Sequence, residues 1–262
     1  MPNQRPHLLI FNPDQWRGDV LGHMGNPAAV TPTLDELVQN EAVSFRQAHC
    51  QNPVCVPSRC SFMTGWYPHV RGHRTMAHML HPERGEPVLL EQLREAGYFV
   101  FWAGKNDMVP GQDGPDRYCD EFFSTTDEDL ARWGLSPQGN LHMNDAWRGE
   151  PGSDTFFSMH AGRLETDEPI YADGDWQCVL GALDFLDRAP TDQPICIFLT
   201  LGAPHPPYGV EEPYFSQIDR AKLPPRIEAP DDWTGKPALM ERIHDAQHMR
   251  SWDETRWNEL RA

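Results

Sequence analysis

Short apolar runs alternate with helical patterns along most of this chain, and this alternation constrains its fold more than any other feature. Runs of strand length ending at Gly or Asn extend from His7 to Phe11, from Tyr98 to Ala103 and from Ile195 to Leu201. Val43 to His49 is also predicted to be a strand. Helical patterns with start or stop signals lie among them, at 31–38, 57–63, 88–96 and 175–189. This order is typical of an α/β fold with a largely parallel central sheet flanked by helices.

Three chemically active side chains each follow the end of a predicted strand. Asp14 comes just after the first run, Lys105 after the second, and His205 after the third. In open parallel sheets, ligands bind beyond the carboxyl ends of the strands. If these strands are neighbours, all three side chains meet at one edge of the sheet, which predicts a site there.

The segment Cys55-Val56-Pro57-Ser58-Arg59, followed by Thr64-Gly65, predicts a nucleophile that meets an oxyanion. Proline suits the first helical position, so a short helix is expected from Pro57 to Met63, with Gly65 ending it. A thiol at a helix start faces free N–H groups and the positive end of the dipole, and should lose its proton easily. Arg59 adds a planar fork of donors suited to sulfate or phosphate oxygens. The alternative is a buried, inert structural cysteine.

Composition narrows the possible partners and the compartment. The 262 residues suffice for one large domain or two small ones, and the net charge of −17 with no basic stripe argues against nucleic acid. No apolar run approaches the roughly 18 residues needed to span a membrane. The N-terminal residues lack the pattern of a signal peptide, so we expect a cytoplasmic protein without a membrane partner.

Two further stretches bear on domain organisation. Residues 107–170 are rich in Gly, Pro and Asp with little periodicity, and we expect an irregular insertion over the site edge, or a disordered flap. Ser251-Trp252-Asp253-Glu254 has the pattern of a capping box opening a helix, and the chain stops within about two turns of it. This predicts a domain truncated at its C-terminus.

The Cys55 to Gly65 segment resembles the signature of the type I sulfatases, members of the alkaline-phosphatase-like superfamily. Further blocks resemble the same family in its own order: Leu8 through Gly22, Thr31 through Asp35, Ala103-Gly104-Lys105, and Pro204-His205 with Pro207. In this family the cysteine is converted after translation to formylglycine, whose hydrated form attacks the sulfate ester. The resemblance covers residues 7 to about 208.

The resemblance implies a role for each candidate residue. Asp14 would bind a divalent metal, Ca²⁺ first, with Mg²⁺ or Mn²⁺ as alternatives, and Cys55 as formylglycine would be the nucleophile and touch the metal. Arg59 would hold the modified residue, and Lys105 would bind a sulfate oxygen. His205 would bind sulfate and help protonate the leaving alcohol. The competing interpretations are a solvated aspartate or lysine, a surface salt bridge at Arg59, and a structural histidine.

The sequence also differs from the family pattern at several positions. The first metal loop usually carries two adjacent aspartates, but Pro13 precedes Asp14 here, as in branches resembling choline sulfatases and phosphonate monoester hydrolases. Asp107 stands where a histidine is common, and a carboxylate there would repel sulfate or contact a cationic or hydroxyl-bearing substrate. No block matching the later metal ligands follows residue 208. Residues 1–262 therefore read as the N-terminal part of a single sulfatase catalytic domain.

The resulting hypothesis is a sulfuric ester hydrolase that acts on a small-molecule sulfate ester. Its further partner would be a formylglycine-generating enzyme that modifies Cys55, and oligomerisation stays open. One alternative is a phosphonate monoester or phosphodiester hydrolase of the same fold, because both anions are tetrahedral. Another is a non-catalytic fragment that needs a partner chain to supply the missing ligands.

Overall fold

The computed structural model describes residues 5–110, 115–136, 159–167, 173–246 and 252–262. The chain forms two compact units, each assembled from separated segments. The first contains residues 1–15, 47–138 and 172–204, and the second contains 16–46, 139–171 and 205–262.

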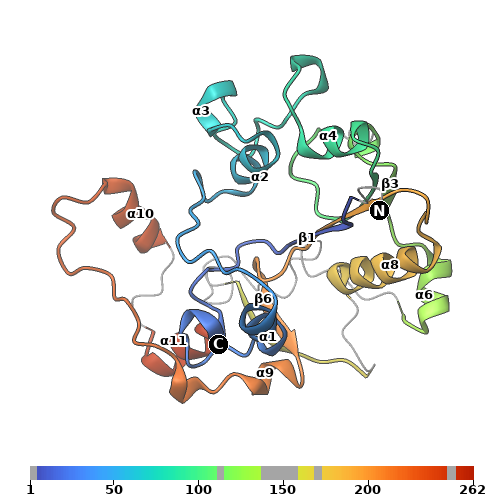
Figure 1. Ribbon diagram of the computed structural model, residues 1–262. Helices are drawn as coiled ribbons and strands as arrows, with labels where there is room; N and C mark the ends of the chain where they lie inside the picture. Colours follow the sequence, from blue (N-terminus) through green and yellow to red (C-terminus); the bar gives the residue numbers. More distant parts are fainter. Residues whose placement is uncertain (1–4, 111–114, 137–158, 168–172, 247–251) are drawn as a thin grey trace. The chain divides into compact units, whose positions relative to one another are not determined.

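A four-stranded parallel sheet forms the centre of the first unit (Figure 1). The strand order is β1 (Leu8–Asn12), β5 (Ile195–Thr200), β2 (Phe99–Gly104) and β3 (Glu121–Phe123). In the register, both Asn12 and Gly104 pair with Thr200, so three strands end at the same level. The predicted α/β class with a parallel sheet is confirmed, and the segments carrying Asp14 and Lys105 leave one edge together.

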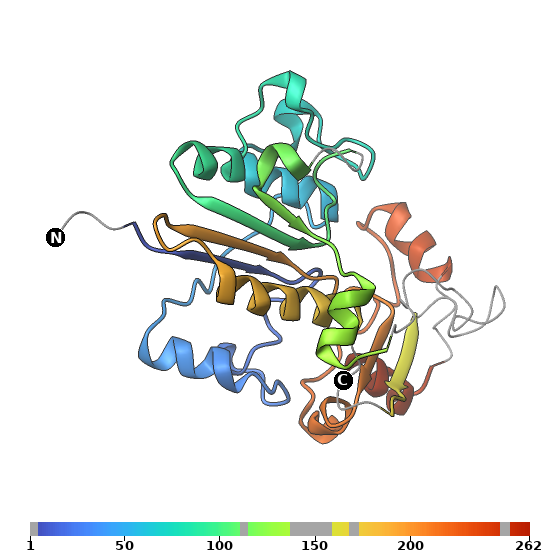
Figure 2. The same cartoon turned by 90° about the vertical axis from the view of Figure 1, so that its right-hand side faces the viewer.

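Helices cover both faces of this sheet (Figure 2). On one face, Val100 and Trp102 of β2 pack in a cluster with α2 (Cys55–Thr64) and α4 (Leu89–Glu95). On the other face, Phe101 and Ala103 of β2 pack with α8 (Gly174–Arg188). Central strands buried on both sides need continuous apolar sequence, which explains the runs found in β2 and β5.

The stretch 107–170 is more regular than its composition predicts. Its described residues include α5 (Pro115–Tyr118), β3, α6 (Asp127–Trp133) and β4 (His160–Leu164). The prediction of irregular structure is wrong for 115–133, because β3 adds an outer strand to the main sheet and Thr126 caps α6 in a capping box. The remainder of the predicted insertion, at 111–114, 137–158 and 168–170, lies outside the described residues.

The second unit has a small parallel pair of strands, β4 with β6 (Tyr208–Glu211). Its helices are short, and none in the described part of the chain is long and apolar enough to cross a membrane. Those in its described residues are η1 (Gly22–Met24), α1 (Pro32–Asn40), α9 (Tyr214–Gln217), η4 (Arg220–Lys222), α10 (Ala238–Ala246) and α11 (Glu254–Arg261). The first unit further contains α3 (Pro68–Arg71) and η2 (Pro82–Arg84).

Two local predictions are wrong. Val43 to His49 forms no strand, and its apolar side chains Val43 and Phe45 are 79% and 80% exposed, so burial gives the segment no reason to join a sheet. The helix α11 is capped by Asp253, whose carboxylate accepts a hydrogen bond from the Arg256 N–H. The capping box proposed to start at Ser251 is therefore placed two residues too early.

Gly104 makes the shared strand ends possible, and its replacement should be costly. Its φ is +100°, and a Cβ there would lie 1.9 Å from the carbonyl oxygen of Thr200. We expect Gly104→Ala to lower the free energy of unfolding by about 3 kcal/mol, because a strained backbone and a displaced strand add together. Urea denaturation measures this. Gly134→Ala is the matched control, with φ +69° but no atom within 4 Å, and should cost about 1 kcal/mol; equal losses would contradict the close-approach argument.

Candidate active site

Asp14, Cys55 and Lys105 come from three elements of the first unit and meet at one place. The Lys105 ammonium lies 2.5 Å from Asp14 Oδ2 and 3.6 Å from Cys55 Sγ. The Cys55 thiol donates to Asp14 Oδ1 over 3.5 Å. The parallel register therefore brings together the two strand-end residues and places both beside the start of α2.

Backbone contacts fix the loop that carries Asp14. The Asp14 N–H donates to the carbonyl of Ala203, in the loop after β5, over 3.1 Å. That loop is held by Asp175, whose two carboxylate oxygens accept from the N–H groups of Gly202 and Ala203 at 2.7 and 2.6 Å. Sequence reasoning missed Asp175, since an acidic residue in a first helical turn is common for dipole reasons alone.

The Lys105 backbone is anchored to the neighbouring strand. Its N–H donates to the Thr200 carbonyl, and the fully buried Thr200 hydroxyl donates to the Lys105 carbonyl, each over 2.8 Å. The Trp102 indole N–H donates to the same hydroxyl over 3.1 Å. These contacts fix the backbone from which the Lys105 side chain extends to Asp14.

Cys55 opens α2, two residues before the predicted helix start at Pro57. Proline at the third position is tolerated because the first N–H groups of a helix have no intrahelical acceptor. The helix runs to Thr64, and Gly65 ends it in the left-handed conformation, as predicted. Cys55 therefore lies within the first turn and is half-buried.

Arg59 is one turn further along α2 and is buried beside Asp14. Its side chain is 6% exposed and that of Asp14 is 8% exposed, with Nη2 3.3 Å from Asp14 Oδ2. This excludes a surface salt bridge for Arg59 and a solvated turn for Asp14. The second terminal nitrogen, Nη1, is buried without a hydrogen-bond partner among the described residues.

The charges of the site stabilise one another. Burial would raise the pKa of Asp14, but the hydrogen bond and charge of Lys105, with the charge of Arg59, hold this pKa below its ordinary value. Burial would lower the pKa of Lys105, but the carboxylates of Asp14 and Asp107 outweigh it and raise this pKa. Both groups are thus ionised at neutral pH.

The Cys55 thiol differs from expectation. Burial raises its pKa, the Lys105 charge lowers it, and Asp14 and Asp107 raise it, with a net increase. The prediction of a readily ionised thiol is therefore wrong, because burial first, and then the two nearby carboxylates, disfavour the thiolate. An unmodified Cys55 is a poor nucleophile at neutral pH, since the thiolate is the reactive form.

The raised pKa of the Cys55 thiol predicts slow alkylation of the unmodified residue. A raised pKa leaves less thiolate at pH 8, so iodoacetamide should react with Cys55 more slowly in the folded protein than in urea. Lys105→Met should slow the reaction further, and Asp14→Asn should speed it. Mass spectrometry of the Cys55 peptide over time measures these rates. Equal rates in folded and denatured protein would contradict the burial argument.

Asp107 also belongs to the cluster. In the sequence it was noted only because it replaces a histidine that is common in the family. Its Oδ2 lies 3.0 Å from the Lys105 ammonium as an ion pair. One potential ligand atom from each of Asp14, Cys55 and Asp107 lies within 4.8 Å of the other two. The chain thus offers two carboxylates and the side chain at position 55 to a cation.

His205 belongs to the second unit, so its predicted meeting with Asp14 and Lys105 stays a prediction. Within its own unit, Nδ1 lies 2.8 Å from the carbonyl oxygen of Pro206.

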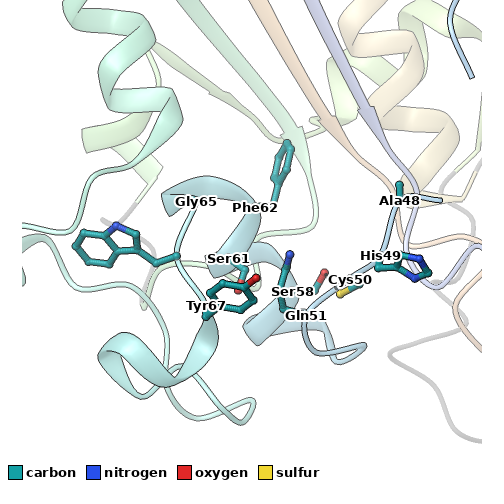
Figure 3. Close-up of a pocket in the computed structure, with 10 residues that line it drawn as sticks. Ala48, His49, Cys50, Gln51, Ser58, Ser61, Phe62, Gly65 and Tyr67 are labelled. Carbon is teal, nitrogen blue, oxygen red and sulfur yellow. Dashed lines mark hydrogen bonds between the residues drawn. The ribbon is translucent and has the colours of Figure 1, made fainter. Parts of the chain in front are cut away.

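A separate cavity of about 520 Å³ lies along α2 (Figure 3). Its wall combines the segment before α2, where Cys50 donates to the Ser58 hydroxyl over 3.2 Å, with aromatic side chains that follow. The residues drawn are Ala48, His49, Cys50, Gln51, Ser58, Ser61, Phe62, Gly65, Trp66 and Tyr67. Asp14, Arg59 and Lys105 are not among the residues that line this cavity, so the charged cluster is the candidate site.

Comparisons with known proteins agree with the motif and the geometry. The sulfatase family model matches residues 6–222, and the chain belongs to this family. An ulvan-active sulfatase of Formosa agariphila is 38% identical over 101 residues, which are 38% of this chain and 19% of the relative. Human N-acetylgalactosamine-6-sulfatase is 24% identical over 280 residues, covering 92% of this chain and 47% of the relative.

A solved structure shares the fold. Phosphonate monoester hydrolase from Silicibacter pomeroyi superposes with a TM-score of 0.61 at 22% identity, covering 98% of this chain and 55% of that one. The chain spans about half the length of most of the curated relatives it matches.

Proposed function

We propose that this chain carries the nucleophile side of a sulfuric ester hydrolase site. The single observation that carries the proposal is the cluster of Cys55, Asp14 and Lys105, assembled from three family motifs. Because the unmodified thiol is hard to ionise, the proposal requires conversion of Cys55 to formylglycine by a modifying enzyme. Formylglycine supplies a hydrated aldehyde whose hydroxyl is the nucleophile toward sulfur.

The residues present fit a divalent cation, with Ca²⁺ favoured over Mg²⁺ or Mn²⁺. Hard carboxylate oxygens suit such ions, and the ammonium of Lys105 already lies against Asp14 where positive charge is stabilised. Asp14 and the modified residue 55 would hold the metal. When bound, the metal would polarise a sulfate oxygen and stabilise charge in the transition state.

The other side chains would position and neutralise the substrate. Lys105 would bind a sulfate oxygen and offset the charge that develops on it. Arg59 would donate to the modified residue 55 from Nη1, which has no hydrogen-bond partner in the described part of the chain. His205, if it joins the site, would give a proton to the leaving alcohol.

A phosphonate monoester or phosphodiester hydrolase is the second candidate, favoured by the single aspartate of the Pro13-Asp14 loop. Rates on 4-nitrophenyl sulfate and on 4-nitrophenyl phenylphosphonate, measured with the full-length protein, separate the two. A higher rate on the phosphonate would overturn the sulfatase assignment.

The decisive experiment is the intact mass of the protein from its native host, with the Cys55 peptide mapped. Conversion of the thiol to an aldehyde supports the proposed hydrolase. An unmodified thiol in an inactive protein would favour the third hypothesis, a non-catalytic chain that needs a partner.

A further inference from the structure

Asp107 lies inside the charged cluster, yet none of the roles proposed above uses it. A divalent cation of the hard class takes six or more oxygen ligands, and Asp14 with residue 55 supplies few of them. The residue before Asp14 is Pro13, which has no carboxylate. Another anionic oxygen from a different loop of the first unit would therefore help to complete the ligand set.

The geometry points to Asp107 as a metal ligand that works together with Asp14 and residue 55, an inference that rests on the proposed metal-dependent function. The three potential ligand atoms lie within 4.8 Å of one another. Calcium holds oxygens at about 2.3–2.6 Å, so two of its ligands can stand up to about 5 Å apart. The spacing is therefore one that a single ion can bridge.

The loop around Asp107 is built to hold this carboxylate in place. Asp107 has a φ of +37°, in the left-handed region that costs a non-glycine residue free energy. The side-chain oxygen of Asn106, Oδ1, accepts from the N–H groups of Met108 and Val109, both at 3.1 Å. Met108 and Val109 are each 2% exposed and anchor the loop in the core. A strained residue held this firmly beside the Asp14 carboxylate and the side chain at position 55 indicates a use for its charge.

Two observations support a ligand site rather than a mere group of acidic residues. The Lys105 ammonium lies 2.5 Å from Asp14 and 3.0 Å from Asp107, so a cation already stands between the two carboxylates. The Arg59 side chain is only 6% exposed, and its Nη2 contacts Asp14. Its Nη1 has no hydrogen-bond partner among the described residues. A metal between the carboxylates would release Lys105 toward a substrate oxyanion.

The test measures Ca²⁺ affinity of the full-length protein by calorimetry after removal of bound metal with a chelator. Asp107→Asn should weaken binding by at least about tenfold, since even outer partners of metal ligands cost 10–100-fold. Asp107→His should weaken it similarly. Asp192→Asn, an exposed residue with the same charge change, should stay within about twofold. Near-unchanged metal affinity in Asp107→Asn would overturn the inference.

A second arm separates ligation from an effect through Lys105. In a Lys105→Met background, Asp107→Asn should still weaken Ca²⁺ binding by about tenfold or more. If its effect vanishes there, Asp107 only positions Lys105 and the inference fails. If the parent protein cleaves sulfate esters and binds Ca²⁺, and Asp107→Asn binds Ca²⁺ equally well, only the inference about Asp107 fails. If the parent protein binds no divalent metal, the proposed metal-dependent function fails as well.

Discussion

Cys55→Ala in the full-length protein is expected to lower kcat/KM for a sulfate ester by at least about 10⁴-fold, because it removes the nucleophile itself. The side chain is half-buried and makes only weak contacts to Asp14 and Lys105, so thermal stability should change little. Steady-state kinetics with 4-nitrophenyl sulfate, alongside thermal unfolding, checks both expectations.

Cys50→Ala is the matched control for this substitution. Cys50 is an exposed thiol in the segment preceding α2 and stands outside the charged cluster, so activity should stay near that of the parent. A Cys55→Ala variant that keeps more than about a tenth of the parent activity would show that position 55 is not the nucleophile.

Asp14→Asn is expected to lower kcat/KM by about 10³-fold and the free energy of unfolding by about 3 kcal/mol. The activity falls because a hard anionic metal ligand and the partner of Lys105 are lost together. The stability falls because the buried Arg59 guanidinium is left without its anion. Kinetics and urea denaturation measure the two effects. The control variant Asp192→Asn should change neither quantity. If Asp14→Asn keeps an activity within about tenfold of the parent, a role for Asp14 in the reaction is contradicted.

The same variant should alter the pH dependence of stability. The pKa of Asp14 is lower in the folded protein than its ordinary value of 3.8, so its contribution is present above that pH. It is lost as the pH falls further, through the lower folded pKa. Asp14→Asn should therefore flatten the acid limb of the stability curve below the ordinary pKa of 3.8. An unchanged acid limb would mean that Asp14 has the same pKa in both states.

Local periodicity was sufficient to predict the elements that bury a face. β2, β5, α4 and α8 lie within a residue or two of their predicted bounds, because burial imposes the period on each sequence. Local periodicity gave a wrong prediction at Val43 to His49, where exposed apolar residues have the pattern of a strand but form none. It also gave no indication of β3. That strand is three residues long, and its pairing with β2 decides its conformation.

Motif spacing and strand ends are local properties, so they were enough to identify the family, the parallel α/β class and four of the residues proposed for the site. How the charges of these residues act on one another could be seen only in the folded chain. The raised pKa of the Cys55 thiol depends on its burial and on its distances to Asp14 and Lys105, which lie far from it in the sequence. In the same way, Asp175 holds the loop after β5 through contacts to Gly202 and Ala203. Electrostatic interactions depend on separation and burial in space, and only the folded register of β1, β5 and β2 sets those.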